Sequence, residues 1–155
     1  MTATVVGIIA PLLPFIWPPP PAGQKKTTLP ITLKKALDQI PENTPVKFQA
    51  PSTGAFVMAT GAGNNAPGDL SFGGYVVNLA GKTHVFSITC SHLGCSIGVN
   101  QGAKTFDCPC HGSRFNFNGT VHNGPATAPL ATYHWKPGSK PEEILIDGLT
   151  LPAGG

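Results

Sequence analysis

Charged side chains are scarce in this sequence. Asp, Glu, Lys and Arg make up 11% of its 155 residues, less than half of the usual share of about 25%. Ten Lys and Arg against seven Asp and Glu leave a formal net charge of +3. That charge is too small and too dispersed for a nucleic-acid-binding surface, so we expect no nucleic-acid partner.

The chain also has few long segments that favour α-helices. The 19 Gly and 17 Pro approach a quarter of the chain, and both residues interrupt helical turns, which favours a loop-rich β domain. A chain of this length supports one hydrophobic core, which excludes a multidomain enzyme. Hydrophobic residues make up 41% of the chain, enough to exclude global disorder.

No apolar run is long enough to span a membrane. Residues 5–17 are apolar but contain Pro11 and Pro14, and a spanning helix needs about 20 residues. No Lys or Arg precedes the run and no clear cleavage site ends it, which argues against a signal peptide. Residues 1–17 are then the end of a membrane anchor that begins outside this chain, a segment that packs on a partner, or a disordered tail. We favour the anchor.

A proline-rich segment follows. Residues 18–28 begin with four consecutive prolines, which adopt extended polyproline II at about 3.1 Å per residue. We predict a tether that holds the anchor away from a globular domain of residues 29–155. At the start of that domain, Leu33, Leu37 and Ile40 have near-helical spacing, which predicts one or two helical turns before Pro41.

From Val46 onward, short β runs alternate with turn residues. Asn118-Gly119 predicts a hairpin with a type I′ turn, which needs positive φ at both central residues. Residues 61–74 predict a loop. The fold class that follows is all-β, an antiparallel β sandwich or small barrel. The predicted strands are residues 46–49, 56–60, 75–79, 85–89, 105–107, 115–117 and 144–146.

All four cysteines lie in two short motifs, CSHLGC at residues 90–95 and CPCHGS at residues 108–113. Each motif offers one Cys and His pair and one further Cys, so two loops that meet at their tips could hold one metal centre. One alternative is a Cys2His2 zinc site, but such pairs prefer spacings of two to four residues and Cys90-x-His92 has one. The other is a disulfide-bonded domain with idle histidines.

The two motifs resemble those of the Rieske iron–sulfur proteins, and most closely the subunit of quinol-oxidising cytochrome bc1 and b6f complexes. They differ at one residue from that subfamily's usual CTHLGC and CPCHGS. Residues 124–129, GPATAP, resemble the family's proline loop. The order of anchor, tether and β domain is also similar, whereas residues 29–80 match only in general character.

The resemblance implies a ligand set. Cys90 and Cys108 would bind one iron of a [2Fe–2S] cluster, and His92 and His111 would bind the other. Two thiolates leave the oxidised centre neutral, whereas four would make it a dianion. Adding an electron to a neutral centre costs less, and the potential rises into a range of roughly −150 to +300 mV. The centre can then accept an electron from a quinol.

The resemblance also implies a disulfide between Cys95 and Cys110. Rieske ferredoxins and ring-hydroxylating oxygenases lack this second Cys pair, so the pair favours the quinol-oxidising branch and an oxidising compartment. The alternative is two buried free thiols.

His111 and His92 are the expected catalytic residues. Electron and proton uptake are coupled at the ligand imidazoles, so one of them can accept a hydrogen bond from a quinol hydroxyl and take its proton. Leu93 is expected at an exposed tip that docks on a cytochrome b-type subunit; the alternative is a leucine in the local core. Gly124 and Pro125 belong to the loop expected to cover the cluster.

Two further residues are expected to tune the cluster. Ser113 matches the family serine whose hydroxyl donates to a bridging sulfide and so raises the potential; the alternative is a serine that only shapes the turn. The family often has Tyr, a second donor, where this chain has Phe115. We therefore expect a lower potential, suited to a quinol such as menaquinol.

The functional prediction is an electron-transfer subunit of a quinol:cytochrome c oxidoreductase. It would take one electron and a proton from quinol and reduce a c-type cytochrome or a plastocyanin-like acceptor, with its domain anchored on the periplasmic or lumenal side of a membrane. The alternatives are a Rieske-type ferredoxin or oxidase small subunit that delivers electrons to another enzyme, and a structural zinc or disulfide module.

Overall fold

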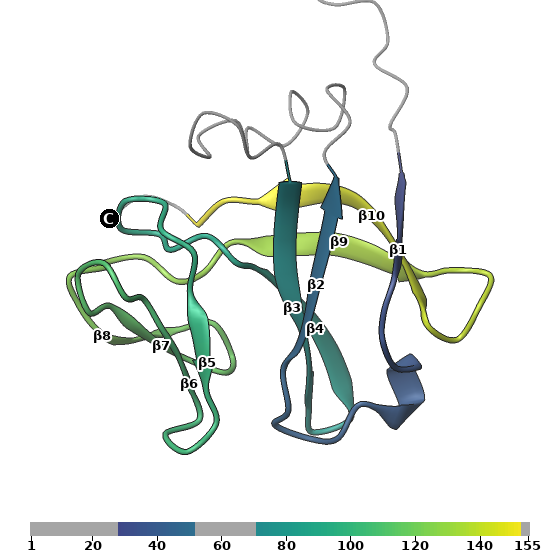
Figure 1. Ribbon diagram of the computed structural model, residues 1–155, viewed down its shortest axis with the longest axis horizontal. Coiled ribbons are helices and arrows are strands. Elements are labelled where there is room, and N and C mark those ends of the chain that lie inside the picture. The colour runs from purple at the N-terminus through teal and green to yellow at the C-terminus, as the bar shows by residue number, and fades with distance from the viewer. Residues whose placement is uncertain (1–27, 52–70, 153–155) are drawn as a thin grey trace, which may run out of the picture.

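The computed structural model describes residues 28–51 and 71–152. Within these ranges the regular structure is ten β-strands in two antiparallel sheets (Figure 1) and one 3-10 turn, η1 (Leu37–Gln39). The all-β prediction is therefore confirmed. No helix in the described ranges has the length and apolar character needed to cross a membrane. The predicted anchor, nearly all of the predicted tether, the strand at 56–60 and the loop up to residue 70 lie outside the described residues.

The larger sheet has six strands and encloses the first of two cores. Its edge strands β1 and β2 contact each other, which curls the sheet toward a barrel. Ile31, Phe48, Val76, Ile144 and Ile146 belong to the core inside it. In spatial order the strands are β1 (Leu29–Thr32), β10 (Glu143–Thr150), β9 (Thr132–Pro137), β4 (Lys82–Ser87), β3 (Ser71–Leu79) and β2 (Val46–Pro51).

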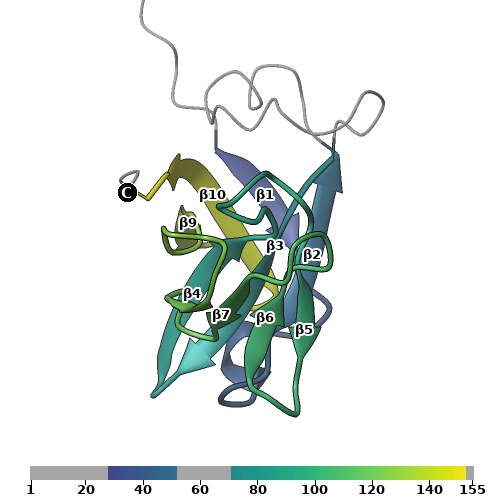
Figure 2. The same ribbon diagram turned by 90° about the vertical axis from the view of Figure 1, so that its left-hand side faces the viewer.

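The smaller sheet faces the viewer in Figure 2 and is inserted in the chain between β4 and β9. It has four strands in chain order: β5 (Gly98–Asn100), β6 (Thr105–Asp107), β7 (Arg114–Asn116) and β8 (Val121–Asn123). The second core lies between the sheets and includes Phe86, Phe106 and Phe115. The buried Tyr75 hydroxyl of β3 donates a hydrogen bond to the Ile97 carbonyl, at 2.9 Å, and so ties the sheets together.

The prediction of one or two helical turns before Pro41 is wrong for residues 29–36. Leu29–Thr32 pairs with β10 as a strand, and only Leu37–Gln39 forms a turn. Alternation explains the difference, because Ile31 and Leu33 are buried whereas Pro30 and Thr32 are exposed. Proline is tolerated in such an edge strand. Pairing with β10 therefore outweighs the helical spacing of the apolar residues, and the segment forms a strand.

The predicted loop at residues 61–74 is wrong at its C-terminal end, because Ser71–Gly74 form the beginning of β3. Gly73 and Gly74 suggested a turn, but both are buried between neighbouring strands. A Cβ on Gly74 would lie 2.7 Å from the Phe48 ring and would also collide with the Phe86 carbonyl. Glycine stands here because another strand comes close, which sequence alone does not distinguish from a turn.

The hairpin between β7 and β8 is present, but its turn differs from the predicted type I′. Gly119 N–H donates to the Asn116 carbonyl at 2.8 Å, and Asn116 N–H donates to the Thr120 carbonyl at 2.9 Å. Positive φ occurs at Gly119, at 83°, and not at Asn118. This pattern is a type I turn followed by a left-handed glycine, the usual three-residue hairpin loop.

Candidate metal centre

Both motifs fold into loops of the same backbone pattern. The first motif loop (residues 90–95) lies between β4 and β5, and the second (residues 108–113) lies between β6 and β7. In each loop, the first Cys carbonyl accepts from a glycine N–H, and its N–H donates to the last residue of the motif. The four bonds are Gly94 to Cys90 (3.0 Å), Cys90 to Cys95 (2.8 Å), Gly112 to Cys108 (3.1 Å) and Cys108 to Ser113 (2.8 Å). Both glycines have positive φ, 82° and 78°.

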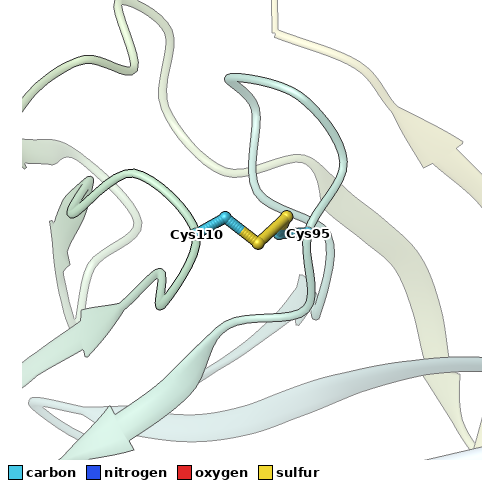
Figure 3. The surroundings of a disulfide bond; sticks show 2 residues. All are labelled: Cys95 and Cys110. Carbon is cyan, nitrogen blue, oxygen red and sulfur yellow. A yellow bond between two sulfur atoms is a disulfide. The ribbon is translucent and has the colours of Figure 1, made fainter.

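A disulfide joins the two loops (Figure 3). Cys95 and Cys110 are bonded, with their Cα atoms 6.5 Å apart and a sequence separation of 15. In the described part of the chain, Cys90 and Cys108 are free and buried. The Cys108 sulfur lies within 4.8 Å of both disulfide sulfurs, but bonded sulfurs offer no thiolate to a metal. The thiols that could bind a metal are therefore those of Cys90 and Cys108.

Two imidazoles complete the donor set. The His92 and His111 rings stand edge to face with their centroids 5.0 Å apart. His111 is exposed and His92 is half-buried, whereas both free thiols are buried. Sulfur donors on the inside and imidazoles toward solvent form a mixed set that suits a [2Fe–2S] cluster with two Cys and two His ligands.

The environment of Cys90 favours a neutral thiol when no metal is bound. Burial raises the pKa of Cys90, and the neighbouring Cys108 thiol raises it further. Hydrogen bonds from the His92 backbone N–H and the Ser113 hydroxyl favour the thiolate and oppose this rise. The remaining cost of a buried thiolate is one that a bound cation offsets.

A third segment, the covering loop (residues 124–129), is bonded to both motif loops. The Ser91 hydroxyl of the first motif loop donates to the Ala128 carbonyl at 2.5 Å. The Ala126 N–H donates to the Ser113 hydroxyl oxygen of the second motif loop at 3.0 Å. Ser113 is fully buried and Ala126 is 4% exposed. Three separate segments therefore converge around the two thiols.

The model of the Rieske [2Fe-2S] domain family matches residues 35–134, which is more than half of the chain. The chain belongs to this family. A Rieske domain is an electron-transfer domain that holds a [2Fe–2S] cluster, so both the predicted family and the predicted cofactor are confirmed.

Several relatives of this Rieske chain are cytochrome b6-f complex iron-sulfur subunits. That of Gloeobacter violaceus is 32% identical over 140 residues, which cover 84% of this chain and 68% of the relative. That of Prochlorococcus marinus is 44% identical over 61 residues, 38% of this chain and 34% of the relative. The YhfW Rieske protein of Bacillus subtilis is 52% identical over 50 residues, 32% of this chain but only 10% of that protein.

A similar solved structure is the plasma membrane Rieske protein PetC3 from the cyanobacterium Synechocystis. It is 30% identical in sequence, with a TM-score of 0.42, and the match covers 62% of this chain and 95% of that protein.

The other residues singled out in this Rieske chain lie around the motif loops. Leu93 is 70% exposed, which excludes the local-core alternative. Gly124 and Pro125 are exposed and joined by a cis peptide bond. Phe115 in β7 is fully buried in the core that also contains the two free thiols. Sequence reasoning missed Ser91; the signal was a hydroxyl where the subfamily usually has Thr.

The loops around the candidate centre carry no formal charge. Residues 88–98, 108–113 and 124–131 contain no Asp, Glu, Lys or Arg. Charge begins at the strand ends, where Asp107 of β6 pairs with Arg114 of β7 at 3.8 Å. Asp107 also accepts hydrogen bonds from Asn100, at 2.9 Å, and Thr105, at 2.7 Å.

Proposed function

We propose that Cys90 and Cys108 bind one iron of the cluster and that His92 and His111 bind the other. Three observations support this assignment: the burial of both thiols, the edge-to-face contact between the two imidazoles, and the engagement of the remaining two cysteines in a disulfide. The zinc alternative is disfavoured by the match to the Rieske family.

We further propose that the chain is the iron–sulfur subunit of a quinol-oxidising cytochrome complex. The Cys95–Cys110 disulfide carries this proposal, because this Cys pair separates the quinol-oxidising subfamily from Rieske ferredoxins and oxygenases. The similarity to the Gloeobacter violaceus subunit, which extends over 84% of the chain, supports it.

The exposed His111 imidazole would accept the hydrogen bond of a quinol hydroxyl and take its proton, with the half-buried His92 as the second candidate. The bound cluster supplies a one-electron acceptor at this point. The exposed Leu93 would contact a cytochrome b-type subunit beside the quinol. A c-type cytochrome or a plastocyanin-like protein would then receive the electron.

The proposed location is the oxidising side of a membrane, periplasmic or lumenal, because a structural disulfide persists in such compartments. Residues 1–17 would anchor the chain and residues 18–28 would tether it. Fractionation of native membranes tests this placement. Co-purification of the chain with a b-type cytochrome is expected, and recovery in a soluble fraction without cytochromes would favour the ferredoxin alternative.

Redox titration of the full chain, monitored by EPR as a function of pH, tests the ligands and the proton coupling. A Rieske-type spectrum is expected, with a midpoint potential that falls at alkaline pH because electron and proton uptake are coupled at the centre. A potential that stays constant across the alkaline range would overturn the coupling.

Reduction by menaquinol in solubilised native membranes tests the quinol role. Leu93→Asp is expected to slow this reduction while the EPR spectrum stays unchanged. Val99→Asp is a matched control, because Val99 is also an exposed apolar residue, at 38%, but lies in β5 outside the motif loops. An equal effect of both substitutions would contradict docking through Leu93.

A further inference from the structure

The covering loop is fastened at two points two residues apart. Its Ala126 N–H donates to Ser113, and its Ala128 carbonyl accepts from Ser91. The two serines lie in different motif loops, so the covering loop bridges both. The sequence alone did not indicate that Ser91, Ser113, Ala126 and Ala128 act together.

The bond from Ala126 limits what the Ser113 hydroxyl can do. A serine hydroxyl has one hydrogen to donate and lone pairs that accept. Because the oxygen accepts from the Ala126 N–H, its own hydrogen is directed elsewhere, toward the side of the centre where Cys90 lies. The backbone of the covering loop therefore sets the direction in which the hydroxyl donates.

Burial makes this arrangement stable. Ser113 is fully buried and Ala126 is 4% exposed, so water does not compete for either partner. Hydrogen bonds that follow one another in a buried chain also strengthen each other. The chain here runs from the Ala126 amide through the Ser113 hydroxyl to a sulfur of the centre.

We propose that the Ala126 backbone amide is a positioning group for the cluster's hydrogen-bond environment: it orients the Ser113 hydroxyl toward the sulfurs of the centre, and Ser91 keeps it in place by holding Ala128. The proposal rests on the ligand set proposed above. A donor to a bridging sulfide or to a ligand sulfur stabilises the more negative reduced state and raises the potential. Ser91 therefore affects the potential through the covering loop.

The chain after the covering loop is attached independently of both serines. Leu130 N–H donates to the Gly119 carbonyl and Ser87 N–H donates to the Ala131 carbonyl, both at 2.9 Å. The Leu130 amide is therefore an internal reference. Because Pro125 and Pro129 have no N–H, residues 124–129 contain only four backbone amides, so exchange at Ala126 can be resolved by mass spectrometry with fragmentation.

Hydrogen exchange of the cluster-loaded full chain is the first test. Ser91→Ala is expected to accelerate exchange at Ala126 by about two- to tenfold, the size of one hydrogen bond's net contribution, with no change at Leu130. Ser91→Thr keeps the hydroxyl and is expected to behave like the parent. Unchanged exchange at Ala126 in Ser91→Ala would overturn the role of Ser91.

A double-mutant cycle of midpoint potentials is the second test. Ser91→Ala and Ser113→Ala are each expected to lower the potential, and the double variant is expected to match Ser113→Ala alone, because Ser91 acts only through Ser113. Equal shifts by Ser91→Ala in the two backgrounds would mean that Ser91 acts directly on its neighbours Cys90 and His92, which would overturn the proposal.

Ala126→Pro tests the amide itself. This substitution removes the N–H and is expected to lower the potential, whereas Ala126→Gly keeps the N–H and is expected to leave it unchanged. If Ala126→Pro does not fold, the cycle with Ser91 and Ser113 still decides the matter. Absence of a Rieske-type EPR spectrum in the parent chain would refute the ligand set instead, so the two failures are distinguishable.

Discussion

Phe115 marks a single-residue difference with an expected redox effect. It is fully buried, two residues after Ser113, where the quinol-oxidising subfamily often has Tyr. Phe115→Tyr is expected to raise the midpoint potential, because a phenol hydroxyl at this position would donate to a ligand sulfur. Potentiometric titration of the cluster measures the change.

Phe117→Tyr is the control for Phe115→Tyr. Phe117 is also buried in the same core, and an added hydroxyl that finds no partner there costs about 1–3 kcal/mol. Only Phe115→Tyr is expected to change the potential. If the potential of Phe115→Tyr does not rise, the argument for a low-potential quinol loses its basis.

His84 on β4 makes folding stability depend on pH. Its ring stacks on Phe86, with centroids 5.9 Å apart. Burial lowers the pKa of His84, and the charge of Lys82 lowers it further. A lowered pKa means that the unfolded chain binds the proton more readily, so stability decreases as the pH falls below about 6.5, the usual pKa of histidine.

Denaturant titrations at several pH values between about 7.5 and 5.5 test the contribution of His84. His84→Gln is expected to lose less stability across this interval than the parent chain. Lys82→Gln is expected to give an intermediate loss, because it removes the second cause and leaves burial. Identical pH profiles for the parent and His84→Gln would contradict the assignment.

At the level of residues, the sequence identifies the centre but not what surrounds it. The spacing of Cys and His in two short motifs is specific, so the two thiols and two imidazoles proposed as ligands could be named in advance. Ser91 could not, because its partner Ala128 is 37 residues away and serine is common in turns. Contacts to backbone atoms leave no residue-specific signal at the partner position.

At the level of elements, several strands with buried residues were predictable, whereas β1, β5, β8 and β9 were not. The predicted strand at 105–107 coincides with β6, and that at 144–146 lies within β10, where Ile144 and Ile146 are buried. By contrast, β5 and β8 have three residues each and none is buried, and β9 contains Pro137. Hydrogen bonding to neighbouring strands forms these strands without a pattern in their own residues.

The turn between β7 and β8 depends on Gly119. Its φ is 83°, and a Cβ at this position would lie 2.5 Å from the Phe86 ring. Gly119→Ala is therefore expected to destabilise the fold by about 2–5 kcal/mol, the sum of left-handed backbone strain and overpacking. Chemical denaturation measures the difference.

Gly81→Ala separates these two causes. Gly81 has a φ of 77° in the turn between β3 and β4, but a Cβ there would meet nothing within 4 Å. Only the backbone strain applies, so a loss of about 1–2 kcal/mol is expected. Equal losses for the two glycines would show that the Phe86 ring moves aside.

At the level of the whole molecule, the smaller sheet is held on the larger by aromatic side chains and one disulfide-bonded pair of loops. Phe106 of the smaller sheet packs on Tyr75 and Phe86 of the larger, with ring centroids 5.0 and 6.3 Å apart. The motif loops lie at the ends of strands in both sheets. Their relative position therefore depends on how the two sheets are joined.

Removal of the disulfide tests this dependence. The double substitution Cys95→Ser, Cys110→Ser is expected to lower the free energy of unfolding by about 3 kcal/mol, the usual value for a 15-residue loop. Denaturant titration followed by both the cluster's visible absorbance and far-ultraviolet circular dichroism measures it. Reduction of the disulfide in the parent chain is expected to reproduce this loss of stability. An unchanged denaturant midpoint after either treatment would contradict the stabilising role of the disulfide.

The absence of formal charge in residues 88–98, 108–113 and 124–131 bears on how fast this end of the molecule meets a partner. Electrostatic steering accelerates encounters between charged surfaces and weakens as added ions screen them over about 8 Å. Encounters through these uncharged loops gain little from electrostatic steering, so added salt has little attraction to screen. Their bimolecular rate constants, measured by stopped flow at low and high ionic strength, are therefore expected to be nearly equal, and a steep decrease would place the contact on another face.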